Sequence, residues 1–254
     1  MFDYQQPDGM IIDCIYTDPS ENNARDSKPP LVCWAVDEIF THTGDTAFVA
    51  EMYPQLLSYY KWWYEKRDHN RNGMCEYGAT DGTLEAAAWE SGMDNAIRFD
   101  GAVMLKNEGY EDAWSMDQES VDLNAYLALE CKLLKKFSSL LKIPFDAPDY
   151  SSQVADYFFD KNINFFCDRR LKGRFIHRRA GLRSLHSVVD PDCHTSASGQ
   201  HAAHASRYGK VLHVYPLPDH CRRQSQIQSA RLLAWSYLVG PDLLRYPRPA
   251  QLWI

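Results

Sequence analysis

The chain has 254 residues, a net charge of −7, and 45% hydrophobic and 13% aromatic residues, which suit one large globular domain or two small ones. The acidic balance argues against nucleic acid as the main partner, and no stretch approaches the roughly 18–20 apolar residues that a membrane span needs. The seven cysteines are never spaced as CxxC, so mostly buried thiols are expected instead of a zinc site or a full disulfide framework. No signal peptide is visible, and the compartment stays open.

The first helices are predicted between residues 31 and 68. In residues 31–44, apolar side chains recur at helical spacing, and Gly44 stands where a left-handed C-terminal cap is expected. Asp45 is predicted to be the N-cap of a second helix. Pro54, as a first-turn proline, is expected to open a third helical piece.

Residues 68–76, DHNRNGMCE, place oxygen-bearing side chains at alternate positions of a short loop. Such side chains can point at one centre, and Ca²⁺ prefers roughly six to eight oxygen ligands. The start matches an EF-hand loop, but the acidic residue comes at the ninth position and not the twelfth, so an EF-hand is excluded. An Asn- and Gly-rich turn after a helix is the alternative. The predicted calcium ligands are Asp68, Asn70, Asn72, Glu76 and the Met74 carbonyl.

Residues 86–100, AAAWESGMDNAIRFD, bring a Trp, a Glu, a Ser-Gly pair and an Asp onto a loop or helix entry. Cleavage of a glycosidic bond needs a carboxylic acid that protonates the leaving oxygen, and Asp94 is the candidate. Trp89 is expected to exclude water from this acid and to stack on a sugar, while Gly92 permits the turn. Arg98 is expected to hold a substrate hydroxyl or to order a carboxylate. A turn that simply caps a helix is the alternative, which the residues alone favour.

Two further helices are predicted in residues 119–141 and 151–166, and strand signals are sparse. The helices come in pairs, and the loops between them hold the polar residues. This pattern predicts an all-α fold, either an array of α-hairpins or an α/α toroid.

The composition changes after residue 176. Residues 177–254 contain no Glu, only four Asp and seven of the nine His, and their periodicity matches neither a helix nor a strand. We therefore divide the chain into a helical domain, 1–176, and an anomalous tail, 177–254. A histidine cluster in this anomalous tail is rejected as a metal site, because it lacks second-shell partners. It consists of His194, His201 and His204.

Six segments of the helical domain carry a recognisable pattern. They are, in chain order, FDYQQPDGMIIDC, KPPLVCWAV, VAEMYPQLLSYYKWW, RDHNRNGMCEYGATDG, WESGMDN and QESVDLNAYL. In this order they resemble glycoside hydrolase family 63, in the branch that includes bacterial α-glucosidases and mannosylglycerate-type hydrolases. The resemblance implies an (α/α)₆ barrel with Asp94 as the general acid, and it supports a structural calcium ion in the 68–76 loop. It also places near the sugar pocket the residues Lys28, Trp34, Trp89 and Glu90.

The resemblance further implies an inverting hydrolase, which needs a second carboxylate as general base. In this family a Tyr-Trp-Arg-Gly-Pro-x-Trp motif and the basic Glu lie in later barrel helices, and neither appears in residues 177–254. Codons shifted by one base can spell family-like sequence there, so we expect a frameshifted tail, and we expect earlier helices to be missing. The chain is then a partial (α/α)₆ barrel with negligible turnover of small glycosides or oligosaccharides.

Two alternatives stay open. A trehalase-like hydrolase is one, because ESGxD, Arg98 and VDLN are shared with trehalases. A calcium-stabilised helical fragment without activity is the other.

Overall fold

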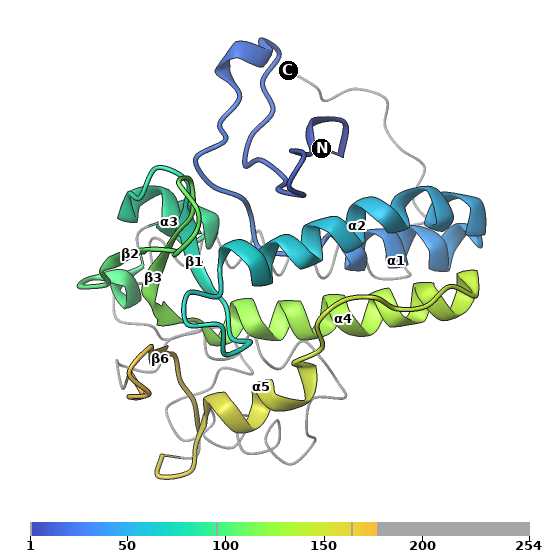
Figure 1. Cartoon of the computed structure of the whole chain (residues 1–254). Coiled ribbons are helices and arrows are strands. Elements are labelled where there is room, and N and C mark those ends of the chain that lie inside the picture. The colour runs from blue at the N-terminus through green and yellow to red at the C-terminus, as the bar shows by residue number, and fades with distance from the viewer. Residues whose placement is uncertain (1, 95, 164, 177–254) are drawn as a thin grey trace, which may run out of the picture. The chain divides into compact units, whose positions relative to one another are not determined.

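The structure is a computed structural model that describes residues 2–94, 96–163 and 165–176 (Figure 1). The chain divides into two compact units, Met1–His201 and Ala202–Ile254, and every described residue belongs to the first unit. The predicted tail and its histidine cluster lie outside the described residues, and the division after residue 176 stays a prediction.

Three long helices form the main layer of the described part (Figure 1). Helix α1 spans Val32–Thr43, α2 spans Thr46–Lys66 and α4 spans Val121–Leu141. Helix α2 packs along α4, and α1 contacts both. The hydrophobic core lies between them and is rich in aromatic side chains, because α2 alone buries Tyr53, Tyr59, Tyr60, Trp62 and Trp63.

The connection between α1 and α2 confirms the predicted caps. Gly44 has a φ of 68° and donates its N–H to the Phe40 carbonyl, which closes α1 with a left-handed residue. Asp45 then accepts the Phe48 N–H at 3.0 Å through its carboxylate. Two residues therefore end one helix and begin the next, and they set the α1–α2 hairpin.

The third helical piece that was predicted to begin at Pro54 is wrong. Pro54 is exposed inside α2, which runs without a break from Thr46 to Lys66. A proline removes one backbone hydrogen bond from a helix. The buried face of α2 continues on both sides of it, through Val49 and Leu56, so packing against the neighbouring helices holds the helix together.

The expectation of an all-α fold is corrected to a helix-rich fold with small sheets. Strands β1 (Glu76–Ala79), β3 (Trp114–Glu119) and β2 (Met104–Lys106) pair antiparallel in that order, and β6 (Arg169–Arg170) also pairs with β3. Helix α3, Leu84–Glu90, packs on β1 and β3. All of β1 is buried, and β3 buries polar residues, so neither strand shows the alternating pattern that would have predicted it.

The helix predicted for residues 151–166 is correct only in its first half. Helix α5 spans Ser151–Phe158, and a hairpin of β4 (Phe159–Asp160) and β5 (Phe165–Phe166) follows it. The Asp160 carboxylate accepts the Asn162 N–H at 2.8 Å, which starts the turn. Phe159, the C-cap residue of α5, is already extended, with φ −81° and ψ 112°, so the chain leaves the helix just before this turn.

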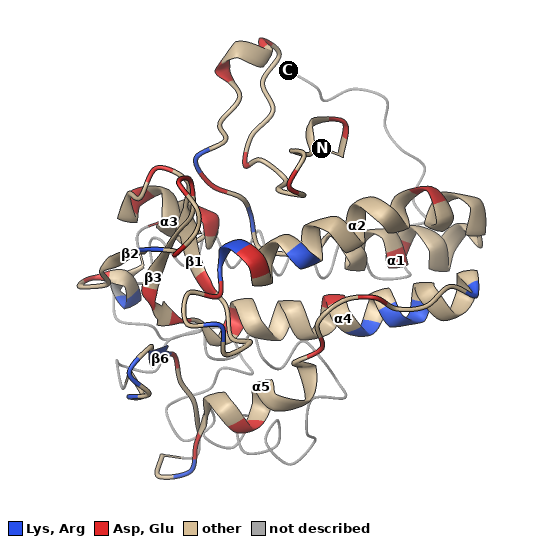
Figure 2. Ribbon diagram, in the orientation of Figure 1, with Lys and Arg blue, Asp and Glu red and all other residues tan. Residues whose placement is uncertain are grey.

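Ion pairs join α4 to its neighbours. Figure 2 shows basic residues along the second half of α4. Lys136 pairs with Asp37 of α1 at 2.5 Å, and Lys135 pairs with Asp149, which lies just before α5. These pairs are partly exposed, so each contributes little to the free energy of folding.

The remaining described elements are short. The 3₁₀ helices are η1 (Phe2–Tyr4), η2 (Pro19–Glu21) and η3 (Ile97–Phe99). Within the described residues, no helix combines the length and the apolar character that crossing a membrane requires. The five cysteines in this part are free thiols and four of them are buried, which confirms the expectation for these residues.

Candidate active site

Asp94 stands on a tight turn that follows α3. Ser91 donates its hydroxyl to the Ala88 carbonyl at 2.6 Å and accepts the Met93 N–H at 3.1 Å. Gly92 has a φ of 66°, a conformation that favours glycine. The turn, residues 91–94, is therefore at a helix exit and not a helix entry, and we call it the acid turn. It leaves Asp94 exposed, so the exclusion of water by Trp89 is not found here.

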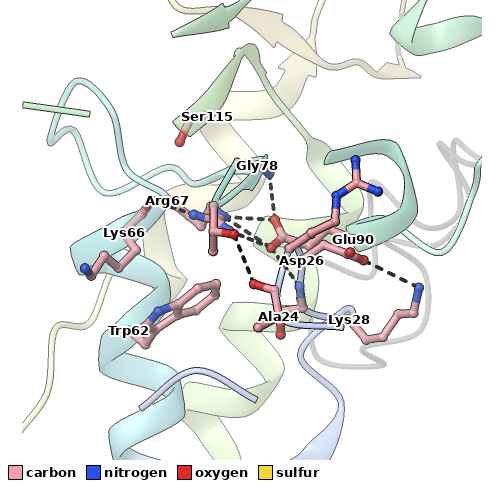
Figure 3. A network of polar contacts seen from close by, with 12 residues as sticks. Ala24, Asp26, Lys28, Trp62, Lys66, Arg67, Gly78, Glu90 and Ser115 are labelled. Carbon is pink, nitrogen blue, oxygen red and sulfur yellow. Dashed lines mark hydrogen bonds and ion pairs between the residues drawn. The ribbon is translucent and has the colours of Figure 1, made fainter. Parts of the chain in front are cut away.

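Glu90, the last residue of α3, is fully buried and forms an ion pair with Arg67 (Figure 3). Arg67 Nε donates to both carboxylate oxygens, at 3.2 and 3.0 Å, and Nη2 donates to Oε1 at 2.9 Å. The backbone N–H groups of Ser27 and Gly78 donate to the same carboxylate at 3.2 and 2.6 Å. All of these partners are protein groups in the interior. Glu90 therefore binds other parts of the protein at the residue that directly precedes the acid turn.

Lys28 lies beside Glu90 and is tied to the end of α3 (Figure 3). Its Nζ donates to the Trp89 carbonyl at 2.9 Å and pairs with Asp13 Oδ1 at 2.7 Å. Asp26 Oδ2 is 3.9 Å from the same ammonium. Burial, followed by the charge of Asp13, raises the pKa of Asp26 to about 7. Two carboxyl groups therefore face one half-exposed lysine at the base of the acid turn.

The two predicted tryptophans occupy different parts of the fold. Trp89 is half-buried at the end of α3, and the Arg25 guanidinium lies 5.3 Å from the centre of its ring. Trp34 belongs to α1, where its Nε1 donates to Glu38 at 3.2 Å. The described contacts link Trp89 directly to Lys28, whereas those of Trp34 lie on α1 and α4.

Arg98 is buried and binds carboxylates. Its Nη2 donates to both oxygens of Asp122 at 2.8 Å, and its Nη1 lies 3.6 Å from Asp168. The guanidinium also lies 4.6 Å from the centre of the Phe99 ring. Of the two roles expected for Arg98, this geometry matches the ordering of carboxylates.

Hydrogen bonds within the chain close the 68–76 loop. The Asp68 carboxylate accepts the N–H groups of Asn72 and Gly73 at 3.0 and 2.8 Å. Asn70 Oδ1 accepts the Asn72 N–H at 3.1 Å, and Asn72 Oδ1 accepts the Met74 N–H at 2.8 Å. The side-chain oxygens of the first three predicted ligands are thus engaged with backbone N–H groups.

Some residues of this loop suit a metal ion and others do not. Among the described residues, no group of three or more His, Cys, Asp or Glu side chains is arranged to hold a metal. Glu76 is fully buried, and its Oε1 has no hydrogen-bond partner. Burial, with the charges of Asp68 and Glu119 adding to it, raises the pKa of Glu76. Glu76 thus has one oxygen without a partner, whereas the side-chain oxygens of Asp68, Asn70 and Asn72 accept backbone N–H groups of the turn, and the calcium ion stays a prediction.

Sequence reasoning missed the residues that support the acid turn. Arg67 offered a signal, because it comes four positions after Trp63, directly at the end of α2, and a buried cation requires a partner. Asp26 and Gly78 offered none, because each is ordinary in its local sequence. Their roles arise from contacts between segments far apart in the chain.

The family model for the mannosylglycerate hydrolase MGH1-like glycoside hydrolase domain matches residues 1–219. Mannosylglycerate hydrolase of Thermus thermophilus is 28% identical over 122 residues, 39% of this chain and 28% of that protein. Mannosylglycerate hydrolase MGH2 of Selaginella moellendorffii is 24% identical over 156 residues, 49% of this chain and 30% of that protein. The matched parts are therefore less than a third of the length of each relative.

Solved structures share the fold. A GH63 mannosylglycerate hydrolase of Thermus thermophilus in complex with Tris has a TM-score of 0.65 at 19% identity, covering 85% of this chain and 66% of that chain. Its complex with glucose has a TM-score of 0.56 at 18% identity, covering 85% and 64%. Because the family model spans most of the sequence, the chain belongs to the mannosylglycerate hydrolase MGH1-like glycoside hydrolase domain family.

Proposed function

We propose that this chain supplies the general acid of an inverting α-glycoside hydrolase, with Asp94 as the proton donor. The observation that carries the proposal is the exposed Asp94 carboxyl on a turn whose base is a fully buried ion pair. An exposed carboxyl group is accessible to a glycosidic oxygen and can donate its proton to it. Membership of a glycoside hydrolase family supports this chemistry.

The proposed substrates are small α-glycosides. The relatives are named mannosylglycerate hydrolases, and one solved relative holds glucose. Lys28 and Trp89, which share a hydrogen bond, are proposed to border the sugar site, and Trp34 is proposed to line it from α1. Glu90 and Arg98 are proposed to act without touching the sugar: Glu90 orders the backbone next to the acid turn, and Arg98 orders carboxylates.

The proposal also covers the fold of the domain and the second carboxylate that an inverting hydrolase needs. We place the α1–α2 hairpin and α4 in part of an (α/α)₆ barrel, and a solved relative that matches 85% of this chain with a TM-score of 0.65 supports this. An inverting pair needs carboxyl groups about 6.5–9.5 Å apart. Residues 177–254 lack the family motif that precedes the general base, so we expect this chain to show negligible hydrolysis.

Azide is a nucleophile that needs no general base, so it can test the general acid by itself. Azide attacks the anomeric carbon from the face opposite the leaving group, the C–O bond breaks, and the leaving oxygen takes the Asp94 proton. The products are a glycosyl azide of inverted configuration and the free alcohol, and Asp94 regains its proton from solvent. We expect azide-dependent cleavage of mannosylglycerate or glucosylglycerate by the 254-residue chain, measured by NMR of the glycosyl azide.

The variant Asp94→Asn should abolish this reaction, whereas Asp100→Asn, which changes another exposed aspartate nearby, should retain it. Full-rate hydrolysis without azide would contradict the missing base. A reaction unaffected by Asp94→Asn would contradict the assignment of the acid. Trehalose in the same panel separates the trehalase-like alternative, which predicts that trehalose is preferred.

A further inference from the structure

We propose that Glu90, held by Arg67, is a positioning residue that fixes the acid turn and so the direction of the Asp94 carboxyl. This inference rests on the proposed function of Asp94. Glu90 ends α3, and the acid turn begins at the next residue. The place of the Glu90 carboxylate therefore determines where the turn starts.

Three segments that are distant in the sequence meet at this carboxylate (Figure 3). Arg67 follows α2, Gly78 belongs to β1, and Ser27 lies in the loop before α1. Arg67 donates to both carboxylate oxygens, the Ser27 N–H donates to Oε1 and the Gly78 N–H donates to Oε2. We call this set, Arg67, Glu90, Ser27 and Gly78, the acid-turn brace. A carboxylate that receives donors from three directions can move little without breaking several hydrogen bonds at once.

The brace has no room to rearrange. Both charged side chains are 0% exposed, so no water can replace a lost partner cheaply. Arg67 lies 4.6 Å from the centre of the Trp62 ring, and its Nη1 donates to the Lys66 carbonyl at 3.1 Å. A Cβ at position 78 would lie 2.7 Å from the Arg67 side chain, so only glycine allows the strand this close.

The brace also positions the proposed border of the sugar site. Ser27 and Lys28 are neighbours, and they bind the Glu90 carboxylate and the Trp89 carbonyl respectively. Trp89 and Glu90 are neighbours as well. These two adjacent hydrogen bonds hold residues 27 and 28 in a fixed position beside the end of α3. Loss of the brace should therefore displace Asp94, Lys28 and Trp89 together.

The test compares local motion with reactivity. Glu90→Gln removes the negative charge at nearly constant size, and Arg67→Lys keeps the positive charge but loses the bidentate fork. Glu130→Gln is the matched control for exchange, because Glu130 is equally buried and accepts N–H groups from Cys33 and Trp34 at the start of α1. Amide hydrogen exchange is measured for Ser91–Asp94, for the start of α1 and for α4, together with the azide-dependent rate.

We expect Glu90→Gln to speed exchange in the acid turn by at least roughly tenfold while α4 keeps its protection. The azide-dependent rate should fall by about 100-fold, the loss expected for a misplaced catalytic group. Arg67→Lys should give smaller changes of the same kind. Glu130→Gln should speed exchange at the start of α1 and leave the acid turn as it is.

Unchanged exchange in the acid turn of Glu90→Gln would overturn the inference, as would a uniform rise in all segments, which marks only global destabilisation. If Glu90→Gln loosens the acid turn but the unmodified chain shows no azide-dependent reaction, the proposed function fails and the brace is supported by exchange alone.

Discussion

Removing Arg67 tests how strongly the buried ion pair holds the fold. Arg67→Met keeps an unbranched side chain but leaves the 0% exposed Glu90 carboxylate without its counter-ion. Only the N–H groups of Ser27 and Gly78 then remain as donors. Loss of one partner of a buried pair typically costs about 3–5 kcal/mol, out of a total of about 5–15 kcal/mol for a domain. We expect a loss of that size for Arg67→Met, and a similar loss for Glu90→Leu.

The double variant should lose less than the two single variants combined. It removes both charges and leaves two backbone N–H groups without acceptors, at about 1–3 kcal/mol each. The expected cost is about 2–6 kcal/mol, against about 6–10 kcal/mol for the sum of the single losses. The difference of several kcal/mol is the coupling between the two residues.

Urea unfolding, followed by tryptophan fluorescence and far-UV circular dichroism with coincident transitions, measures these free energies. Lys61→Met is the control, because the Lys61–Asp146 pair is exposed and should contribute at most about 1 kcal/mol. Additivity of the Arg67 and Glu90 losses to within about 0.5 kcal/mol would refute the reasoning.

Three further predictions concern other described residues. Because the pKa of Asp26 is raised to about 7 in the folded state, the folded state binds a proton that the unfolded state releases between about pH 4 and 7. The free energy of unfolding should therefore fall by at most ~4 kcal/mol as the pH rises through that range. Urea unfolding of Asp26→Asn should show a weaker dependence of this free energy on pH, and an unchanged dependence would contradict the prediction. Gly78→Ala would place a Cβ 2.0 Å from the Trp114 carbonyl oxygen, so it should destabilise by more than about 2 kcal/mol, whereas Gly109→Ala, which has space, should cost only about 1 kcal/mol for its φ of 88°. If the 68–76 loop holds calcium, Tm in differential scanning calorimetry should rise with calcium concentration and Asp68→Ala should remove the rise; a Tm independent of calcium would exclude the site.

Local sequence predicted the helices well where their ends carry a cap. Gly44 and Asp45 act within one turn of the chain, so their roles could be read from neighbouring residues alone. Pro54 and residues 159–166 misled for opposite reasons. Packing of α2 carries a helix across Pro54, whereas the chain leaves α5 at Phe159 and turns at Asp160 in a segment that looks helical. Helix propensity cannot decide either case. The interactions that decide are tertiary packing at Pro54 and the local backbone and side-chain conformation after Phe158.

The α1–α2 hairpin, the free cysteines of the described part and the family pattern around Asp94 could all be predicted from the amino-acid sequence. These features depend on short spacings, which periodicity and motifs record directly. The role of Glu90 as a buried anchor, on which Arg67, Ser27 and Gly78 converge, became visible in the folded chain alone. A buried charge is stable only with partners, and these partners come from segments between 12 and 63 residues away, a separation that local patterns do not encode.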